Sequence, residues 1–305
     1  MRDQPTSNRE AELPAPTRIG PGDWLDPKIV NADCLSEMAA MPDKSVDAVI
    51  TDPPYGTTGL EWDDVSNVIA ALRECLRTSR GVVCVFGSNP FSADVVSGLR
   101  KYWRHGWVWE KEKPANIFQA KRAPMKTHED VLVFAESKWT YNPQMQERLL
   151  KNRRNNSVRT HKSNLYGEGK LMESVGHRSQ KYPTSIQQFT SERQPVHPTQ
   201  KPLALLRYLV RTYTNAGDLV LDAFAGSGTT CLAAMLEGRQ SIGIEKDPKQ
   251  FATAVERISR ELLQHSAFRA GDGFIGLKPL NPTTSDFKSP VVKPKDVALG
   301  SNIQS

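Results

Sequence analysis

The feature that most constrains the fold is the run 46–50, which is short, rich in β-branched residues and almost entirely apolar. Such a run is typical of a buried strand in a parallel sheet. It leads into a stiff loop that contains Asp52, Pro53, Pro54 and Tyr55. Prolines supply no amide donor, fix their own backbone and keep the preceding residue out of the helical region. Asp52 is therefore expected at a strand's carboxyl end beside an aromatic ring, where it suits a planar substrate bearing an amino group.

Short apolar runs alternate with amphipathic segments along much of the remaining chain. Further strands are expected at 28–34, 81–87, 107–110, 130–134, 218–222 and 240–245. Helices are expected at 35–41, 65–77, 90–102, 202–210, 229–238 and 248–263. This alternation predicts an α/β fold with a doubly wound, mostly parallel sheet that helices cover on both faces. We expect one domain in two halves, 26–140 and 196–272, flanked by a flexible N-terminal segment at 1–25 and a flexible tail at 273–305.

The overall composition is typical of a globular cytoplasmic protein. The 305 residues carry a net charge of +6, which weakly favours a polyanionic partner. No stretch approaches the length of a membrane span and the N-terminus lacks the apolar core of a signal peptide, so no membrane partner is expected. Cys34, Cys75, Cys84 and Cys231 are scattered, which predicts reduced thiols. The six histidines are dispersed, so no metal site is expected.

The segment 141–195 is polar and basic and contains few acidic residues. Its candidate nucleic-acid-binding residues are Arg148, Lys151, Arg153, Arg154, Arg159 and Lys162. One interpretation is a solvated insertion, because charge runs are commonly exposed. The other is an insertion that contacts nucleic acid, in which cations meet phosphates and polar groups meet base edges. The segment contains no known DNA-binding motif, so composition alone leaves both interpretations open.

The turn around Gly226, Ser227 and Gly228 follows an expected strand and opens an expected helix. Glycines there allow close backbone approach to a ligand at a helix start with free amides. Glu245 ends the next strand, where a carboxylate can accept both hydrogen bonds of a ribose diol. The turn lacks the third glycine of a dinucleotide site and the lysine of a triphosphate site. A nucleoside with a short zwitterionic chain remains, and S-adenosylmethionine fits that description.

Five blocks of the sequence together resemble a known family. They are Asn31-Ala32-Asp33-Cys34-Leu35, the run 52–56, the run 128–134 with 141–143, the run 197–202, and the run 222–230. In this order they are similar to the β-class amino DNA methyltransferases, in which the catalytic motif precedes the cofactor motif. The resemblance spans about 29–258 and omits the basic segment. It implies a Rossmann-like, S-adenosylmethionine-dependent methyltransferase fold that acts on double-stranded DNA, with 141–195 as a target-recognition insert.

The resemblance also assigns residues to the cofactor. Asp222 and the loop that follows it would bind the cofactor; the loop comprises Phe224, Ala225, Gly226, Ser227, Gly228 and Thr229. Glu245 would hold the ribose, Asp33 and Cys34 the adenine, and Thr199 and Lys201 the carboxylate end. Each assignment has a simpler alternative: Asp33 caps a helix, Thr199 and Lys201 shape a turn, and Glu245 is a surface carboxylate.

The implied reaction is direct methyl transfer to the exocyclic amino group of adenine. Asp52 and the carbonyl of Pro53 would accept the two amino hydrogens, while Tyr55 stacks on a base flipped out of the duplex. If the strands that end at Asp52 and Asp222 are neighbours, the methyl group and the amine can meet. Cytosine-N4 methylation, RNA methylation and a non-catalytic nucleic-acid-binding module remain alternatives. A cognate restriction endonuclease is a candidate partner, and the chain is expected to be a monomer or homodimer.

Overall fold

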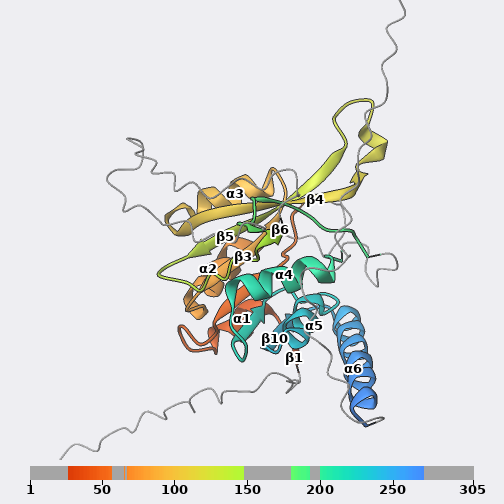
Figure 1. Cartoon of the computed structure of the whole chain (residues 1–305). Helices are drawn as coiled ribbons and strands as arrows, with labels where there is room; N and C mark the ends of the chain where they lie inside the picture. Colours follow the sequence, from red (N-terminus) through yellow and green to blue (C-terminus); the bar gives the residue numbers. More distant parts are fainter. Residues whose placement is uncertain (1–26, 57–64, 66, 148–179, 193–199, 271–305) are drawn as a thin grey trace, which may run out of the picture.

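The computed structural model describes residues 27–56, 65, 67–147, 180–192 and 200–270. Eight strands form one sheet in the order β1-β10-β9-β2-β3-β5-β4-β8 (Figure 1). Their bounds are β1 (Lys28–Asn31), β2 (Ala48–Thr51), β3 (Val82–Gly87), β4 (Trp103–Ala115), β5 (Lys126–Ala135), β8 (Ile186–Gln188), β9 (Leu219–Asp222) and β10 (Gln240–Glu245). The neighbouring strands in the part of the sheet ordered β1-β10-β9-β2-β3 are all parallel. β5 runs antiparallel to β3 and β4, and β8 is parallel to β4. The predicted mostly parallel sheet is confirmed.

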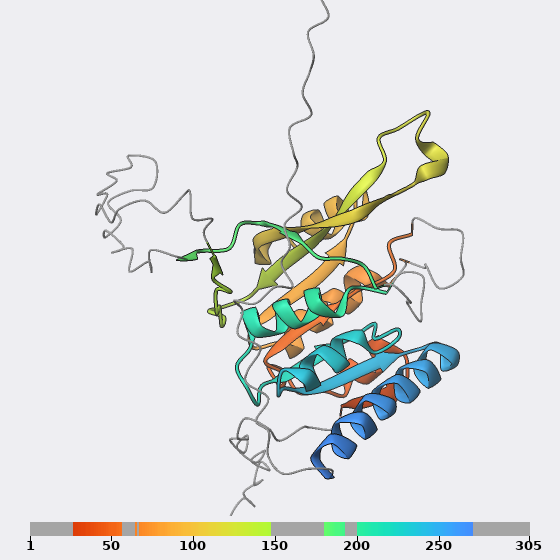
Figure 2. The same ribbon diagram turned by 45° about the vertical axis from the view of Figure 1, so that its right-hand side comes forward.

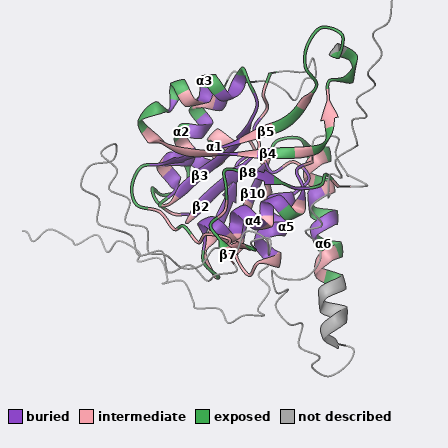
Figure 3. Cartoon of the chain, turned by 45° about the horizontal axis from the view of Figure 1, so that its top comes forward, coloured by how far each residue is buried: buried purple, intermediate pink, exposed green. Residues whose placement is uncertain are grey.

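Helices cover both faces of this sheet (Figures 1 and 2). They are α1 (Cys34–Ala39), α2 (Val68–Thr78), α3 (Phe91–Gly98), α4 (Leu203–Tyr213), α5 (Thr229–Leu236) and α6 (Pro248–Ala270), with short 3-10 turns η1 (Arg100–Tyr102) and η2 (Ile117–Gln119). Successive residues of β2 enter different cores, because side chains alternate along a strand. Val49 packs with residues of α1, α2 and α3, whereas Ile50 packs with residues of α4 and α5. Burial on both faces explains why the strand is apolar up to its last residue, Thr51 (Figure 3).

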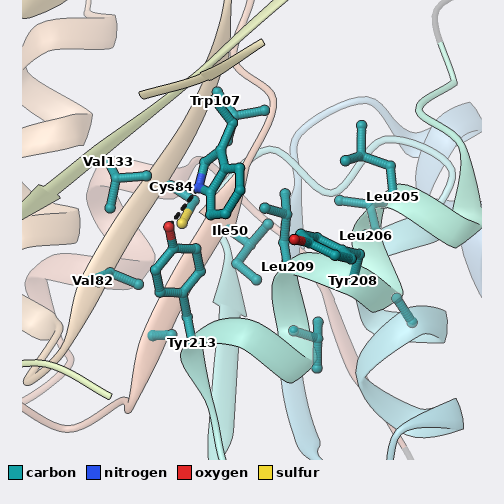
Figure 4. Packing of buried hydrophobic residues seen from close by; sticks show 14 of the residues in the cluster. Ile50, Val82, Cys84, Trp107, Val133, Leu205, Leu206, Tyr208, Leu209 and Tyr213 are labelled. Carbon is teal, nitrogen blue, oxygen red and sulfur yellow. Dashed lines mark hydrogen bonds between the residues drawn. The ribbon is translucent and has the colours of Figure 1, made fainter. Parts of the chain in front are cut away.

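The core on the α4 side contains an aromatic cluster (Figure 4). The indole nitrogen of Trp107 donates a 2.6 Å hydrogen bond to the hydroxyl of Tyr213. The Nε2 atom of His105 lies 2.7 Å from the same hydroxyl. These bonds satisfy the polar ends of rings that are otherwise packed among apolar side chains, as buried polar groups require. They also fix α4 against β4, the long strand near the edge of the sheet.

The ends of the basic segment 141–195 join the domain. β6 (Gln146–Glu147) pairs with β7 (Gln180–Lys181), so the chain leaves and returns at one point. Beyond β7, β8 extends the main sheet, and the carbonyl of Phe189 accepts a 2.9 Å hydrogen bond from the indole of Trp109. Three predicted segments lie outside the described residues: the DNA-contacting residues 148–162, the flexible N-terminal segment 1–25 and the tail 273–305.

β2 and β9 are direct neighbours, with Val49 opposite Leu221. From this pair the sheet continues in opposite directions, to β10 and β1 on one side and to β3 on the other. Open α/β sheets bind ligands at the carboxyl edge where the strand order reverses in this way. The loops that follow Thr51 and Asp222 both begin at this position. The geometric condition that the sequence set for methyl transfer is therefore met.

Candidate active site

The loop after β2 presents a carboxylate that is already held from two sides. Asp52 Oδ1 accepts a 2.6 Å hydrogen bond from the Tyr55 hydroxyl, and Asp52 Oδ2 lies 2.5 Å from Lys201 Nζ. The Tyr55 ring stacks on Phe91 at a centroid distance of 5.1 Å. Burial raises the pKa of Asp52, and the positive charge of Lys201 opposes this rise. Tyr55 therefore orients the carboxylate, a role that the sequence did not predict for it.

Lys201 belongs to a chain of alternating charges that extends away from Asp52. Its Nζ lies 3.4 Å from Glu129 Oε2, and Glu129 Oε1 accepts a hydrogen bond from Lys111. Burial alone would raise the pKa of Glu129, but the two lysines hold it below its usual range. Burial alone would likewise lower the pKa of Lys201, but Asp52 and Glu129 raise it. Lys201, predicted to reach the cofactor's carboxylate end, is thus paired in this structure with the carboxylate of Asp52.

The loop after β9 is anchored to the loop after β2 through Asp222. This side chain is buried, and its Oδ1 accepts hydrogen bonds from Thr51 Oγ1 at 2.7 Å and from the Phe224 amide at 3.1 Å. Burial raises the pKa of Asp222 to about 6. Because Thr51 immediately precedes Asp52, Asp222 connects the two loops that the proposed reaction requires. Asp222 is placed to position the site from beneath it.

Two glycines in this loop have left-handed backbone angles, with φ of +51° at Gly226 and +74° at Gly228. A Cβ on Gly228 would also lie 3.1 Å from atoms of Ala254 and Ile258 on α6. Gly228 is therefore required by its backbone conformation and by close helix packing. The neighbouring Ala225 is buried and donates its amide to the carbonyl of Ile244.

Arg257 on α6 supports the same loop from below. Its guanidinium lies 3.2 Å from the Ser227 carbonyl and 2.7 Å from Thr229 Oγ1. All three residues are buried, and burial lowers the pKa of Arg257. The sequence analysis missed this contact because one arginine among several on an amphipathic helix carries no distinguishing pattern.

Glu245 is not a free surface carboxylate, because the backbone of two loops holds it. Its Oε2 accepts a 2.7 Å hydrogen bond from the Gly226 amide, and its Oε1 accepts a 2.8 Å bond from the Asp247 amide. Burial raises its pKa. Each of its oxygens still has a second lone pair, so a diol can bind there while the loop stays in place.

Asp33 and Cys34 lie beside Glu245 in space. Asp33 Oδ1 accepts a 3.2 Å hydrogen bond from the Ser36 amide, so it caps α1. The preceding residue, Ala32, donates its amide to the Glu245 carbonyl. Burial raises the pKa of the half-buried Cys34 thiol to about 11. The loops after β1, β9 and β10 therefore meet at one edge, while Thr199 lies outside the described residues.

The described part of the chain contains no grouping of three or more His, Cys, Asp or Glu side chains arranged to hold a metal ion. All four cysteines are free thiols. None of the described helices combines the length and apolar character that crossing a membrane requires.

A protein family model matches most of the described domain. The family model for the DNA methylases of the N6/N4 methyltransferase family matches residues 46–256, which is more than half of the chain. The chain belongs to this family. It is therefore a DNA methylase that acts on an exocyclic amino group, in a family that depends on S-adenosylmethionine.

Relatives of this DNA methylase agree with that assignment. The Type II methyltransferase M.HinfI of Haemophilus influenzae is 26% identical over 91% of this chain and 76% of its own length. The crystal structure of M1.HpyAVI with S-adenosylmethionine is 27% identical, has a TM-score of 0.50 and matches 75% of this chain and 98% of its own. The cytosine-N4-specific PvuII DNA methyltransferase shares the fold at 15% identity, with a TM-score of 0.55 and coverage of 82% and 94%.

Asp52, Tyr55 and Lys201 were all named from the sequence, but their contacts with one another were not predicted. Glu129 lies in one of the blocks that carry the family resemblance, two residues before the buried run of β5 begins at Val131. An acidic residue entering a buried strand is a usable signal, because such a group requires a cationic partner. Identifying Lys111 and Lys201 as those partners required the fold, since they lie 18 and 72 residues from Glu129 in opposite directions.

Proposed function

We propose that this DNA methylase transfers a methyl group from S-adenosylmethionine to the N6 amino group of adenine within a specific site in double-stranded DNA. One observation carries the proposal. Asp52 follows β2, and the glycine loop follows the neighbouring strand β9. The hydrogen bond between Thr51 and Asp222 connects these two strand ends. This arrangement brings an acceptor for an amino group next to a nucleoside-binding loop.

The cofactor, when bound, supplies an electrophilic methyl group. The residues present fit it: Glu245 can accept hydrogen bonds from the ribose, Asp33 and Cys34 lie at the same edge for the adenine, and the loop 224–229 contacts the remainder. Thr199 is proposed for the carboxylate end together with Lys201, provided that Lys201 exchanges partners on binding. The buried contacts of Arg257 with Ser227 and Thr229 hold this loop in one conformation before the cofactor binds.

The chain's contribution to the reaction follows from the weakness of the nucleophile. The exocyclic nitrogen of adenine is conjugated with its ring, so its lone pair is poorly available. Asp52 and the Pro53 carbonyl accept its two hydrogens, which favours a tetrahedral nitrogen with its lone pair directed at the methyl group. Asp52 can then take up the proton that the methylated nitrogen releases. Alignment of the two reactants contributes roughly 7–11 kcal/mol in well-oriented systems.

An acidic residue at position 52 supports adenine as the target. By resemblance, cytosine-N4 enzymes more often carry serine at this position, whereas the chain has Asp52. We also propose that the insert 141–195 recognises the target sequence. The similarity to a Type II methyltransferase supports a role in restriction–modification with a cognate endonuclease.

The test is methylation of plasmid DNA by the purified chain, followed by mass spectrometry of the nucleosides. We expect N6-methyladenine, and we expect Asp52→Ala to reduce its formation by roughly 10²–10⁴-fold. Binding of S-adenosylmethionine, measured by calorimetry, should persist in this variant. Asp43→Ala serves as the matched control, because that side chain is 74% exposed.

Two results would contradict the proposal. N4-methylcytosine as the sole product would replace adenine with cytosine as the target. Simultaneous loss of cofactor binding in Asp52→Ala would show that Asp52 maintains the structure of the site rather than binding the amino group.

A further inference from the structure

Strands β4 and β5 continue past the body of the domain as a two-stranded ribbon (Figures 1 and 2). We call residues 113–126 the arm; Ala115 pairs with Lys126 within it, and η2 forms its tip. A hairpin that extends this far from a sheet gains little from the domain's core. Its presence is therefore better explained by a function than by a contribution to folding stability.

The tip of the arm is unusually apolar for a solvated loop. Phe118 is fully exposed at 105%, Ile117 is 68% exposed and Met125 is 44% exposed. Single exposed apolar residues are common, but three on one small tip form a patch that indicates a binding surface. Among the described residues, none covers the side chain of Phe118.

The flanks of the tip are positively charged. Lys113, Lys121 and Arg122 are exposed, Lys126 is half-buried, and the arm contains no acidic residue. These four cations form no ion pair with any other described residue, unlike Lys111 at the arm's base. Cations beside apolar side chains match a polyanion that also presents apolar faces, which describes the phosphates and bases of DNA.

The arm begins at the active site. Lys111 on β4 and Glu129 on β5 flank its base and belong to the charge chain that reaches Lys201 and Asp52. Phe118 lies seven positions after Lys111, a span of at most about 23 Å at 3.3 Å per residue. A two-stranded ribbon fits the major groove of B-DNA. A duplex with its target base at Asp52 is therefore within reach of the arm.

We propose that the arm enters the duplex beside the target base and that Ile117 and Phe118 pack between the bases, stabilising the flipped-out state. Apolar side chains inserted between base steps partly unstack them, which lowers the remaining cost of extruding a nucleotide. The cations of the arm neutralise adjacent phosphates. This inference rests on the proposed function, because it assumes that the substrate is a base within duplex DNA.

The test compares a variant carrying Ile117→Ser and Phe118→Ser with the wild type on two duplexes. In one, the target adenine is paired with thymine; in the other, it faces an abasic site, where extrusion costs less. We expect kcat/KM to fall by about 10- to 100-fold on the paired duplex, given the typical strength of stacking on an aromatic side chain. Most of the activity should be recovered on the second duplex. Leu263→Ser, at a 70% exposed position on α6, is the control.

Base extrusion is also measured without methyl transfer, by the fluorescence of 2-aminopurine at the target position. An increase with the wild type that the arm variant lacks supports the arm even if no methylated base forms, a result that would overturn only the proposed function. Equal fluorescence and equal kcat/KM in both proteins would overturn the inference. So would a decrease of equal size on both duplexes, or a change in molar mass by light scattering that identifies the tip as a contact between two copies.

The cations of the arm are tested separately. Replacing Lys113, Lys121 and Arg122 with glutamine should reduce the slope of log K against log salt by up to about 0.9 for each phosphate that is no longer neutralised. An unchanged slope would show that the arm's charges do not meet phosphates.

Discussion

The ionisation of Asp52 determines whether its carboxylate can accept a hydrogen bond from the target amino group. A protonated carboxyl would have to donate at one oxygen, which is useless toward an N–H group. Burial favours that protonated form, whereas the Lys201 ammonium at 2.5 Å favours the carboxylate. Glu129 in turn keeps Lys201 charged and is itself balanced by Lys111. The four side chains form one electrostatic unit, so removing the charge of any of them changes the pKa of Asp52.

Removing the charge of Lys201 should therefore shift the acid limb of the reaction. In Lys201→Met the pKa of Asp52 rises further, so the acid limb of the kcat/KM profile should move to higher pH. Lys201→Arg keeps the charge and should retain most of the wild-type profile. The measurement is kcat/KM for DNA between pH 5 and 9. If the profile stays fixed while KM for S-adenosylmethionine rises, Lys201 serves the cofactor's carboxylate end instead.

Asp222 should make the stability of the protein depend on pH. Its pKa lies near 6 in the folded chain and near 3.8 when unfolded, so the folded state binds more protons between these values. Stability accordingly decreases as pH rises from about 4 to 6, by up to about 3 kcal/mol. Asp222→Asn removes this contribution and should show a smaller decrease over that range. Urea unfolding of both proteins at pH 4 and pH 7 measures the difference, and parallel behaviour would contradict it.

The elements differ in how clearly the sequence announces them. The strands of the parallel half were predicted within a few residues, because burial on both faces leaves an uninterrupted apolar run such as Val82–Gly87. β4 was predicted only at 107–110, since its outer part bears charged residues that belong to the arm rather than to the core. The predicted helix 90–102 ends earlier, at Gly98, and η1 follows it. β8 was missed because its three residues lie in a basic segment whose overall composition masks a buried Gln187 and Phe189.

The glycine loop packs against α6, and two matched substitutions can distinguish backbone strain in the loop from crowding against the helix. Gly226→Ala introduces only backbone strain, about 1–2 kcal/mol, because nothing lies within 4 Å of the new Cβ. Gly228→Ala carries the same strain and also presses on Ala254 and Ile258 at 3.1 Å, which adds about 1–3 kcal/mol. Denaturant unfolding should therefore find Gly228→Ala the less stable of the two. Equal stabilities would mean that α6 moves aside without cost.

At the scale of the whole molecule, the sheet explains how a site can be built from blocks that are far apart in the chain. Asp52 and Asp222 are 170 residues apart, yet their strands are hydrogen-bonded neighbours. The sequence motifs placed both residues after apolar strands and left the adjacency of those strands as a condition, which the structure meets. They were insufficient for Lys201 and Arg257, whose partners depend on side-chain packing between elements. A motif identifies the residues at strand ends but not the long side chains that reach them from elsewhere.

We propose two surfaces for DNA, the basic insert and the arm, and charge-removing substitutions in each can test them separately. Arg153→Gln combined with Arg154→Gln should weaken DNA binding and reduce its salt slope by up to about 1.8, because each phosphate contact contributes about 0.9. The control variant removes two cations from the exposed turn η1, with Arg100→Gln and Lys101→Gln, and should keep the wild-type slope. Fluorescence anisotropy with a labelled duplex at several salt concentrations measures both. A reduced slope in the insert variant with unchanged 2-aminopurine fluorescence would assign the insert to binding and leave base extrusion to the arm. An unchanged slope would exclude these two arginines from the DNA interface.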